Sequence, residues 1–206
     1  MSIWSEIYKK QMSEFDSLDS FINYKLDYKI VLINTIKKYA RTTKKILEAG
    51  CGSGITCTFL AQKGYNVTGV DSDPDMVELA TSIAEKQSCS ALFKIDDIRL
   101  LNTLIDEHFD VVFSNGVMEH FSDAEIISIL NQHLLVGDYV IVSIPSDYFT
   151  ETQKIYGNER FLGKEKWVQI ISLTKGKIVE EFSFNSDPSK IHKEIPQFIG
   201  FVITSL

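Results

Sequence analysis

The chain has few cysteines, few prolines, no long apolar run and no excess of basic residues. Its three cysteines, at positions 51, 57 and 89, form no CxxC pair, so their spacing favours neither a disulfide framework nor a zinc site. No apolar run reaches the ~18 residues that a membrane span requires, and the charged start of the chain lacks the apolar centre of a signal peptide. We therefore expect a soluble protein of the reducing cytoplasm, with no metal site and no membrane partner.

The charge balance points away from nucleic acids. The 21 Lys and Arg residues are outnumbered by 28 Asp and Glu residues, for a formal net charge of −7, whereas nucleic-acid binding depends on clustered basic side chains. Hydrophobic residues make up 44% and charged residues 24% of the 206 residues, which is typical of one folded domain with a substantial core. The sequence carries no indication of the oligomeric state.

The order of hydrophobic and polar residues predicts an α/β protein. Residues 1–43 are expected to be helical and to form an N-terminal cap or lid, ahead of a domain over residues 44–206. In that domain, β-branched segments alternate with helical ones, which predicts a parallel sheet covered on both faces. Strands are expected at 45–49, 66–70, 91–95, 109–113, 139–144, 177–184 and 198–204, and helices at 55–63, 74–85, 122–135 and 163–173.

One part of the domain lacks a clear period. The segment 146–162 is polar and aromatic, and it follows the fifth expected strand. Segments at the carboxyl edge of a parallel sheet commonly contact the substrate. We therefore treat residues 146–175 as an insertion on the substrate side of the domain.

The most informative stretch runs from Glu48 to Gly54 (EAGCGSG), between an expected strand and an expected helix. Glycines at such a turn allow a ligand to approach the backbone, and the helix start offers free N–H groups. About twenty residues further on, Asp71 ends the next strand, where a carboxylate can bind both hydroxyls of a ribose. A dinucleotide-binding G-x-G-x-x-G fits poorly, because Ile55 or Cys57 stands at the third glycine. The alternatives are a plain tight turn for the glycines and an Asx-turn opened by Asp71.

Four blocks of the sequence resemble the class I S-adenosylmethionine-dependent methyltransferases. They are EAGCGSG at 48–54, VDSDPDM at 70–76, the acidic pair at 96–97 and FDVVFSNGVMEH at 109–120, in the order and spacing of the family over residues 44–145. The resemblance implies a Rossmann-like fold with a seven-stranded, mostly parallel sheet whose last strand is reversed. It also implies methyl transfer from S-adenosylmethionine to an oxygen or nitrogen of a small molecule, with S-adenosylhomocysteine as product. The N/D-P-P-Y tetrad of nucleic-acid adenine methylases is replaced by NGVM at 115–118, which disfavours that branch.

The same resemblance implies a cofactor site, residue by residue. The implied contacts are Glu48 near the ammonium group; Gly50, Cys51, Gly52 and Gly54 around the methionyl part; Asp71 at the ribose; Ser72 and Met76 near the adenine; Asp97 and Ile98 at the edge of that ring; and Asn115 at the methionine end. For Met76, ordinary core packing is the alternative. For the acidic pair, a solvated loop is the alternative.

Histidine supplies the candidate general base. Of the histidines at 108, 120, 133 and 192, His120 follows the fourth expected strand, at the cofactor end of the sheet. A base assists an acceptor that must lose a proton, such as a hydroxyl, and Glu119 beside it could orient or charge the imidazole. The alternative is that His120 only packs there or shapes the cofactor pocket.

The insertion supplies candidate contacts for the methyl acceptor, namely Tyr148, Tyr156 and Arg160. The aromatic rings could exclude water, and the guanidinium could meet an anionic group. The alternative for Arg160 is an ion pair with an acidic residue in a folded surface loop. Aromatic residues of the N-terminal segment, such as Trp4 and Tyr8, could close over the cofactor or pack in the core.

Two other functions remain open. A nicotinamide-dependent oxidoreductase has a similar sheet, but the glycine spacing and Glu48 oppose it. A non-catalytic protein that binds S-adenosylmethionine or S-adenosylhomocysteine would carry the same cofactor motifs, because such motifs say nothing about turnover.

Overall fold

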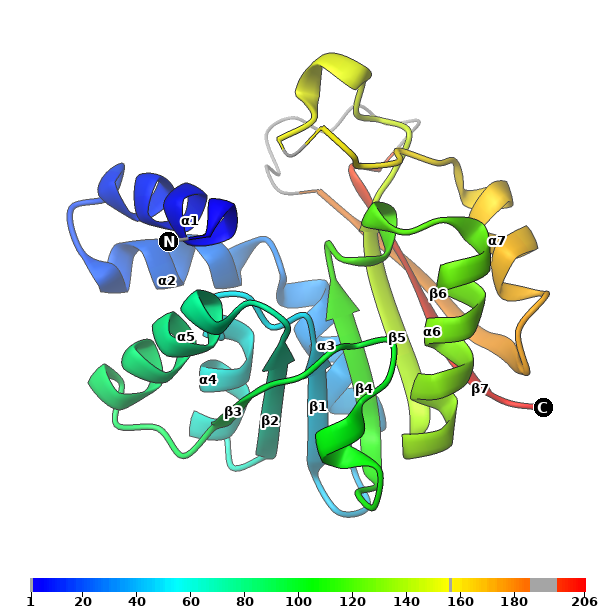
Figure 1. The fold of residues 1–206 in the computed structure, drawn as a ribbon, viewed down its shortest axis with the longest axis horizontal. Coiled ribbons are helices and arrows are strands. Elements are labelled where there is room, and N and C mark those ends of the chain that lie inside the picture. Colours follow the sequence, from blue (N-terminus) through cyan, green and yellow to red (C-terminus); the bar gives the residue numbers. More distant parts are fainter. Residues whose placement is uncertain (1, 156, 186–195) are drawn as a thin grey trace.

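Seven strands form one mixed sheet in the computed structural model, which describes residues 2–155, 157–185 and 196–206 (Figure 1). Their order across the sheet is β3-β2-β1-β4-β5-β7-β6. The first five strands are parallel, and β7 runs antiparallel to both of its neighbours. The strands are β1 (Lys45–Ala49), β2 (Asn66–Asp71), β3 (Leu92–Ile95), β4 (Phe109–Asn115), β5 (Gly137–Pro145), β6 (Gly176–Phe184) and β7 (Phe198–Ser205).

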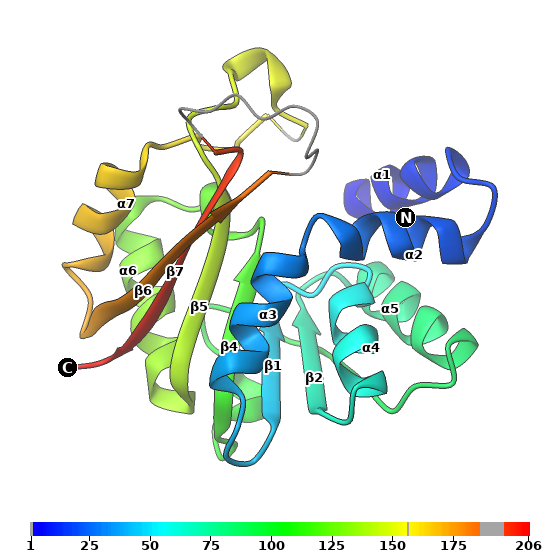
Figure 2. The same cartoon turned by 180° about the vertical axis from the view of Figure 1, so that it is seen from behind.

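Helices cover both faces of this sheet. Helices α6 and α7 lie on the face seen in Figure 1, and α3 and α4 lie on the face seen in Figure 2, while α5 contacts β2 and β3. None of the helices in the described part of the chain is both long and apolar enough to cross a lipid bilayer. The helices are α1 (Ile3–Ser13), α2 (Leu18–Asp27), α3 (Ile30–Tyr39), α4 (Ile55–Gln62), α5 (Pro74–Lys86), α6 (Asp123–Val136) and α7 (Lys164–Ile171), with short 3-10 turns η1 (Asn102–Leu104), η2 (Met118–His120) and η3 (Glu151–Gln153).

The predicted fold is confirmed, including the reversal of the last strand. Each expected strand and helix of residues 44–206 is present, and their ends differ from expectation by one or two residues. The helix starts follow local capping chemistry. The Asp73 side chain accepts from the Asp75 N–H with Pro74 at the first helical position, and Ser122 and Glu125 form a capping box at the start of α6.

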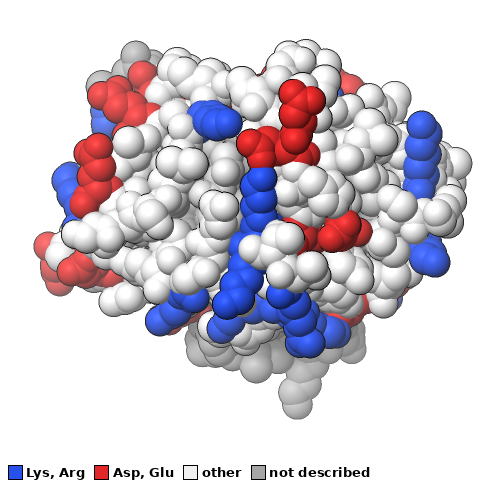
Figure 3. Space-filling model, turned by 90° about the horizontal axis from the view of Figure 1, so that it is seen from below, with Lys and Arg blue, Asp and Glu red and all other residues white. Residues whose placement is uncertain are grey.

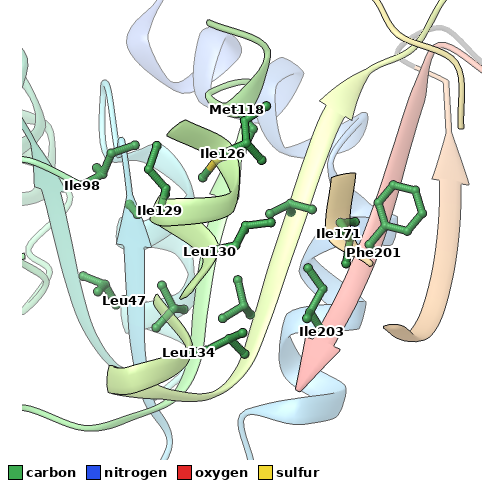
Figure 4. Close-up of a cluster of buried hydrophobic side chains, with 14 of the residues drawn as sticks. Leu47, Ile98, Met118, Ile126, Ile129, Leu130, Leu134, Ile171, Phe201 and Ile203 are labelled. Atoms are coloured by element: carbon green, nitrogen blue, oxygen red, sulfur yellow. The ribbon is translucent and has the colours of Figure 1, made fainter. Parts of the chain in front are cut away.

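The core lies on both sides of the central strands. On one side, α6 and α7 bury side chains such as Leu130 and Ile171 against Leu47 and Phe201 of the sheet (Figure 4). On the other side, α3 packs Ile33 and its neighbours against the sheet in a second cluster. A sheet buried on both faces explains why its central strands are almost continuously apolar.

The N-terminal segment divides between two places. Helix α3 contacts β4, β5 and β6 and belongs to the core, whereas α1 and α2 lie beyond the end of the sheet, next to α5 and α4 (Figures 1 and 2). Phe21 of α2 is fully buried with Ile55 of α4 and Ile83 of α5. The Ser2 N–H also donates to the Asp75 carboxylate at 2.5 Å. The segment is therefore helical as predicted, and its role as a lid stays a prediction.

The strand order places a crevice at the carboxyl ends of β1 and β4. From β1 the chain adds β2 and β3 on one side of the sheet and β4 and β5 on the other. The loops that leave β1 and β4 consequently turn to opposite faces, and ligands of open α/β sheets bind at such reversal points. The glycine-rich stretch leaves β1 here, and the Asn115 segment leaves β4 beside it.

At the opposite end of the molecule, Asp110 holds the turn that leads into β1. Its carboxylate accepts hydrogen bonds from the Thr43 N–H at 2.9 Å, the Thr43 hydroxyl at 2.6 Å and the Lys44 N–H at 3.0 Å. Lys44 has a left-handed backbone, with φ 56°. Figure 3 shows this end, where Lys and Arg side chains lie among Asp and Glu side chains. The buried Asp110 carboxylate therefore ties the connection after α3 to β4.

We expect Asp110→Ala to lower the free energy of unfolding by about 2 kcal/mol or more, because charge-assisted hydrogen bonds contribute roughly 1.5–3 kcal/mol each. Urea denaturation followed by circular dichroism measures the change. Asp138→Ala is the control, since it removes an exposed carboxylate that pairs with exposed His108. Equal midpoints for the two variants would contradict the role given to Asp110.

Candidate functional site

A cavity of about 350 Å³ opens at the crevice between β1 and β4. Its walls come from helix α1, from the loops after β1, β2, β3 and β4, and from the segment that follows β5. The lining residues are Trp4, Tyr8, Gly50, Gly52, Asp71, Ser72, Met76, Asp97, Ile98, Arg99, Asn115, Gly116, Val117, His120, Phe121 and Asn158. Residues far apart in the sequence thus meet at one edge of the sheet.

A larger cavity, of about 480 Å³, lies near α7 and the strands β6 and β7. Its lining includes Ser146, Asp147, Lys164 and Glu165 of the expected insertion 146–175, but none of the individual residues predicted to contact the cofactor or the acceptor or to act as the base. Its charged lining residues Lys164 and Glu181 pair with each other at 2.5 Å. The chemistry predicted from the sequence therefore belongs to the smaller cavity.

The glycine-rich loop forms the floor of the smaller cavity. Gly52 has a left-handed backbone, with φ 52°, and a Cβ there would come within 3.1 Å of the Tyr8 hydroxyl, so glycine keeps the backbone accessible. Gly54 also has a positive φ, of 67°, but a Cβ there would meet the Phe93 ring at 2.6 Å. Gly54 therefore allows the loop to pack on β3 and does not itself line the cavity.

Asp71 links the ends of β1 and β2. Its carboxylate accepts the Gly52 N–H at 2.9 Å and the Asp73 N–H at 3.0 Å, so it opens an Asx-turn and also holds the glycine-rich loop. Burial raises the pKa of the Asp71 carboxyl, and these two backbone N–H groups limit the rise. A carboxylate has about four acceptor positions, so Asp71 can also accept hydrogen bonds from a ligand in the cavity.

Asn115, at the end of β4, presents an acceptor that lacks a partner. Its Oδ1 atom is buried and has no hydrogen-bond partner within the described residues, and Asn115 lines the cavity. A buried acceptor without a partner costs roughly 1–3 kcal/mol. A ligand with a donor, such as an ammonium group, would remove that cost, so the site suits a cationic or N–H-bearing ligand.

The two residues of the acidic pair, Asp96 and Asp97, have different surroundings. The Asp96 carboxylate is buried and accepts from the Asn102 N–H, the Thr103 N–H and the Thr103 hydroxyl. Asp97 lines the cavity, and its carboxylate forms a bidentate ion pair with Arg99, at 3.0 Å from Nε and 2.6 Å from Nη2. The hydrogen bonds from Arg99 lower the pKa of the Asp97 carboxyl.

Glu48 lies behind the glycine-rich loop and does not line the cavity. It is 3% exposed, and its Oε2 atom accepts from the Cys57 thiol at 2.9 Å. Burial raises the pKa of Glu48 to about 7, although the nearby Lys29 ammonium acts in the opposite direction. The side chain is therefore buried beside the glycine-rich loop and is not exposed in the cavity, and its predicted place near the ammonium group stays a prediction.

His120 lies in η2 and lines the cavity. Its Nδ1 atom is 2.8 Å from the Oδ1 atom of Asn158, and its ring meets the Trp4 ring edge-on, with centroids 5.4 Å apart. Glu119 does not line the cavity. It is buried, and burial raises its pKa to about 8, with the Glu159 carboxyl adding to the rise.

Two of the three predicted acceptor contacts, Arg160 and Tyr148, are not among the residues that line the cavity. Arg160 donates to the Phe121 carbonyl at 2.6 Å and pairs with Asp123 at 2.5 Å, so the ion-pair alternative holds for it. Tyr148 packs edge-on against Phe149, with centroids 5.4 Å apart, and does not line the cavity. Tyr156 lies outside the described residues.

Comparisons with known proteins point to methyltransferases. The sequence model of the family described as Methyltransferase domain matches residues 46–136. The chain is 30% identical over 146 residues to the ubiquinone biosynthesis O-methyltransferase of Rickettsia typhi, covering 69% of this chain and 56% of that protein. It is 33% identical over 82 residues to the protein of the same name from Coxiella burnetii, covering 40% of this chain and 35% of that protein.

Solved structures share the whole fold. The crystal structure of an S-adenosylmethionine-dependent methyltransferase from Clostridium acetobutylicum superposes with a TM-score of 0.72 at 16% identity, covering 97% of this chain and 99% of that one. The family-model match, these relatives and the shared fold together support a class I S-adenosylmethionine-dependent methyltransferase family for this chain. The chain spans only 35% and 56% of the length of these two curated relatives.

The structure brings together most of the residues that the family resemblance implies. Those that line the cavity are Gly50, Gly52, Asp71, Ser72, Met76, Asp97, Ile98, Asn115 and His120, while Glu48, Cys51, Gly54, Tyr148 and Arg160 do not. Met76 lines the cavity and is also 1% exposed, so it packs in the core, and its contact with the adenine stays a prediction. Arg99 and Gly116 were missed by the sequence analysis. The D-x-R spacing from Asp97 to Arg99 is the only signal that could have found the former.

The raised pKa of Glu119 predicts how the stability of the protein depends on pH. Between its ordinary pKa of 4.5 and the raised value of about 8, the unfolded chain has lost this proton and the folded chain keeps it. The stability of the wild type therefore falls as pH rises through this window, by up to about 1.4 kcal/mol per pH unit. Glu119→Gln removes this dependence, so the melting temperature of the variant minus that of the wild type should increase from about pH 5 to about pH 8.

Thermal denaturation followed by circular dichroism measures this difference at each pH. Glu14→Gln is the matched control, because it neutralises an exposed glutamate in the same way. If the melting temperature of Glu119→Gln differed from that of the wild type by the same amount at every pH, Glu119 would be ionised in the folded protein.

Proposed function

We propose that this protein transfers a methyl group from S-adenosylmethionine to a hydroxyl group of a small molecule, with nitrogen acceptors as the second class. One observation carries the proposal. The glycine-rich loop, the Asp71 carboxylate and the buried Asn115 acceptor meet in the cavity that His120 also lines. The residues proposed to bind the cofactor and the candidate base therefore line the same cavity.

The residues present fit the cofactor. The backbone of Gly50 and Gly52 gives the methionyl part a surface without side chains, and the Asn115 Oδ1 atom can accept from its ammonium group. Asp71 has acceptor positions left for the ribose hydroxyls after binding the Gly52 and Asp73 amides. Ser72, Met76, Asp97 and Ile98 would surround the adenine.

S-adenosylmethionine supplies a methyl group on a positively charged sulfur and leaves as S-adenosylhomocysteine. The protein chiefly has to hold the acceptor oxygen in line with that methyl group, because positioning alone can contribute most of the rate. His120 accepts the hydroxyl proton as the new carbon–oxygen bond forms. The rings of Trp4 and Phe121 exclude water from the place where the acceptor would lie.

The nature of the acceptor rests on the relatives. Two relatives, at 33% and 30% identity, are named as O-methyltransferases of ubiquinone biosynthesis, which supports a phenolic hydroxyl as acceptor. The aromatic side chains that line the cavity suit a planar ring. We infer no role for nucleic acid, in view of the net charge of −7, and we place the protein in the cytoplasm, which the free thiols of all three cysteines support.

Isothermal titration calorimetry tests the cofactor. S-adenosylmethionine and S-adenosylhomocysteine should bind, and NAD should not. Asp71→Ala should weaken both by at least about tenfold, because it removes charge-assisted hydrogen bonds worth roughly 1.5–3 kcal/mol each. Since Asp71 also holds the Gly52 amide, a urea midpoint must accompany each titration, and Asp106→Ala controls for lost charge. Tight NAD binding without any response to S-adenosylmethionine would overturn the proposed function.

Turnover tests the base. Release of S-adenosylhomocysteine is measured across a panel of phenols and catechols, including 3,4-dihydroxybenzoate. His120→Ala should reduce turnover by roughly 10²–10⁴-fold and leave cofactor affinity nearly unchanged. His108→Ala is the control, since His108 pairs with Asp138 at the other end of the sheet. Full activity of His120→Ala would remove it from the mechanism, and binding without turnover on any acceptor would favour a non-catalytic binding protein.

A further inference from the structure

The segment after η3 runs alongside the segment that carries His120. The Arg160 N–H donates to the Glu119 carbonyl at 2.9 Å, and the Arg160 guanidinium donates to the Phe121 carbonyl at 2.6 Å. The same guanidinium pairs with Asp123 at 2.5 Å. Arg160 thus fixes residues 158–160 to residues 119–123, on either side of the candidate base.

This attachment brings Asn158 against the imidazole. The Asn158 Oδ1 atom lies 2.8 Å from His120 Nδ1, and both residues line the cavity. An amide oxygen is only an acceptor, so the hydrogen on this contact must come from Nδ1. In a neutral imidazole a hydrogen on Nδ1 leaves Nε2 as the nitrogen with the lone pair.

We propose that Asn158 is a positioning residue that holds His120 in the tautomer with hydrogen on Nδ1, so that Nε2 is the nitrogen that accepts the proton of the acceptor. The inference rests on the proposed function, because it gives a role to the base assigned there. The segment expected to contact the acceptor thereby acts on the reaction through His120. Arg160 serves the same end by anchoring Asn158, which explains why its guanidinium is turned away from the cavity.

The physical reason is the cost of the other tautomer. With hydrogen on Nε2, the Nδ1 lone pair would face the Asn158 oxygen at 2.8 Å, and two acceptors would oppose each other. The Trp4 ring, edge-on to the imidazole, limits its rotation. Hydrogen bonding of one ring nitrogen is the usual means by which proteins choose which nitrogen of a histidine reacts.

Nitrogen-15 NMR of the imidazole rings tests the tautomer directly and needs no acceptor. The wild-type spectrum should show His120, identified by its loss in His120→Gln, with hydrogen on Nδ1 at a pH where the ring is neutral. Asn158→Ala should shift His120 towards the tautomer with hydrogen on Nε2. Asn158→Asp keeps an acceptor oxygen and should preserve the wild-type tautomer. Asn66→Ala, at an exposed position at the start of β2, is the matched control and should change nothing.

Kinetics supply the second measurement. On a phenol that the wild type methylates, Asn158→Ala should lower kcat about three- to tenfold, the equivalent of one neutral hydrogen bond, without raising KM for S-adenosylmethionine. Asn158→Asp should recover most of the loss. A wild-type His120 with hydrogen on Nε2, or an unchanged kcat in Asn158→Ala, would overturn the inference and leave the proposed function standing. Failure to bind S-adenosylmethionine would overturn the proposed function and leave the tautomer assignment intact.

Discussion

The hydrogen bond from the Gly52 amide to the Asp71 carboxylate is the contact on which the site depends. It joins the loop after β1 to the end of β2, two points that are nineteen positions apart in the chain and side by side in the sheet. Without it, the partly buried carboxylate would lose one of its two backbone donors, and the Gly52 amide would lose its partner. The left-handed backbone of Gly52 allows the bond to form at a residue that also lines the cavity. Sheet, loop and binding surface are therefore specified together.

Much of this could be predicted from the sequence because the signals are local. β-branched runs, helix caps and the position of Pro74 define the elements, and parallel strands require helical crossovers between them. The fold follows once these are combined with the glycine-rich turn. The place of Asp71 and Asn115 follows too, since they stand at the carboxyl ends of β2 and β4, the parallel strands on either side of β1.

Which of these side chains face the cavity could not be predicted from the sequence. Glu48 is on β1, where side chains alternate between the two faces of the sheet. Its carboxylate is buried and accepts from the Cys57 thiol of α4. Arg160 pairs with Asp123, thirty-seven positions away, and no local pattern indicates that partner. The contact of Asn158 with His120 depends on that pairing, so it also emerges only from the folded chain.

The edge-on packing of Trp4 against His120 places an indole ring in the wall of the cavity, where its fluorescence can report on a bound ligand. The protein has two tryptophans, and Trp167 is 1% exposed in the core beside α6. Trp4 instead borders the cavity, so its indole meets whatever enters there. Indole emission responds to the polarity and charge of its surroundings, whereas a tryptophan sealed among aliphatic side chains gives a steady background. The natural chain thus carries a fluorescent reporter at its own binding site, without any label.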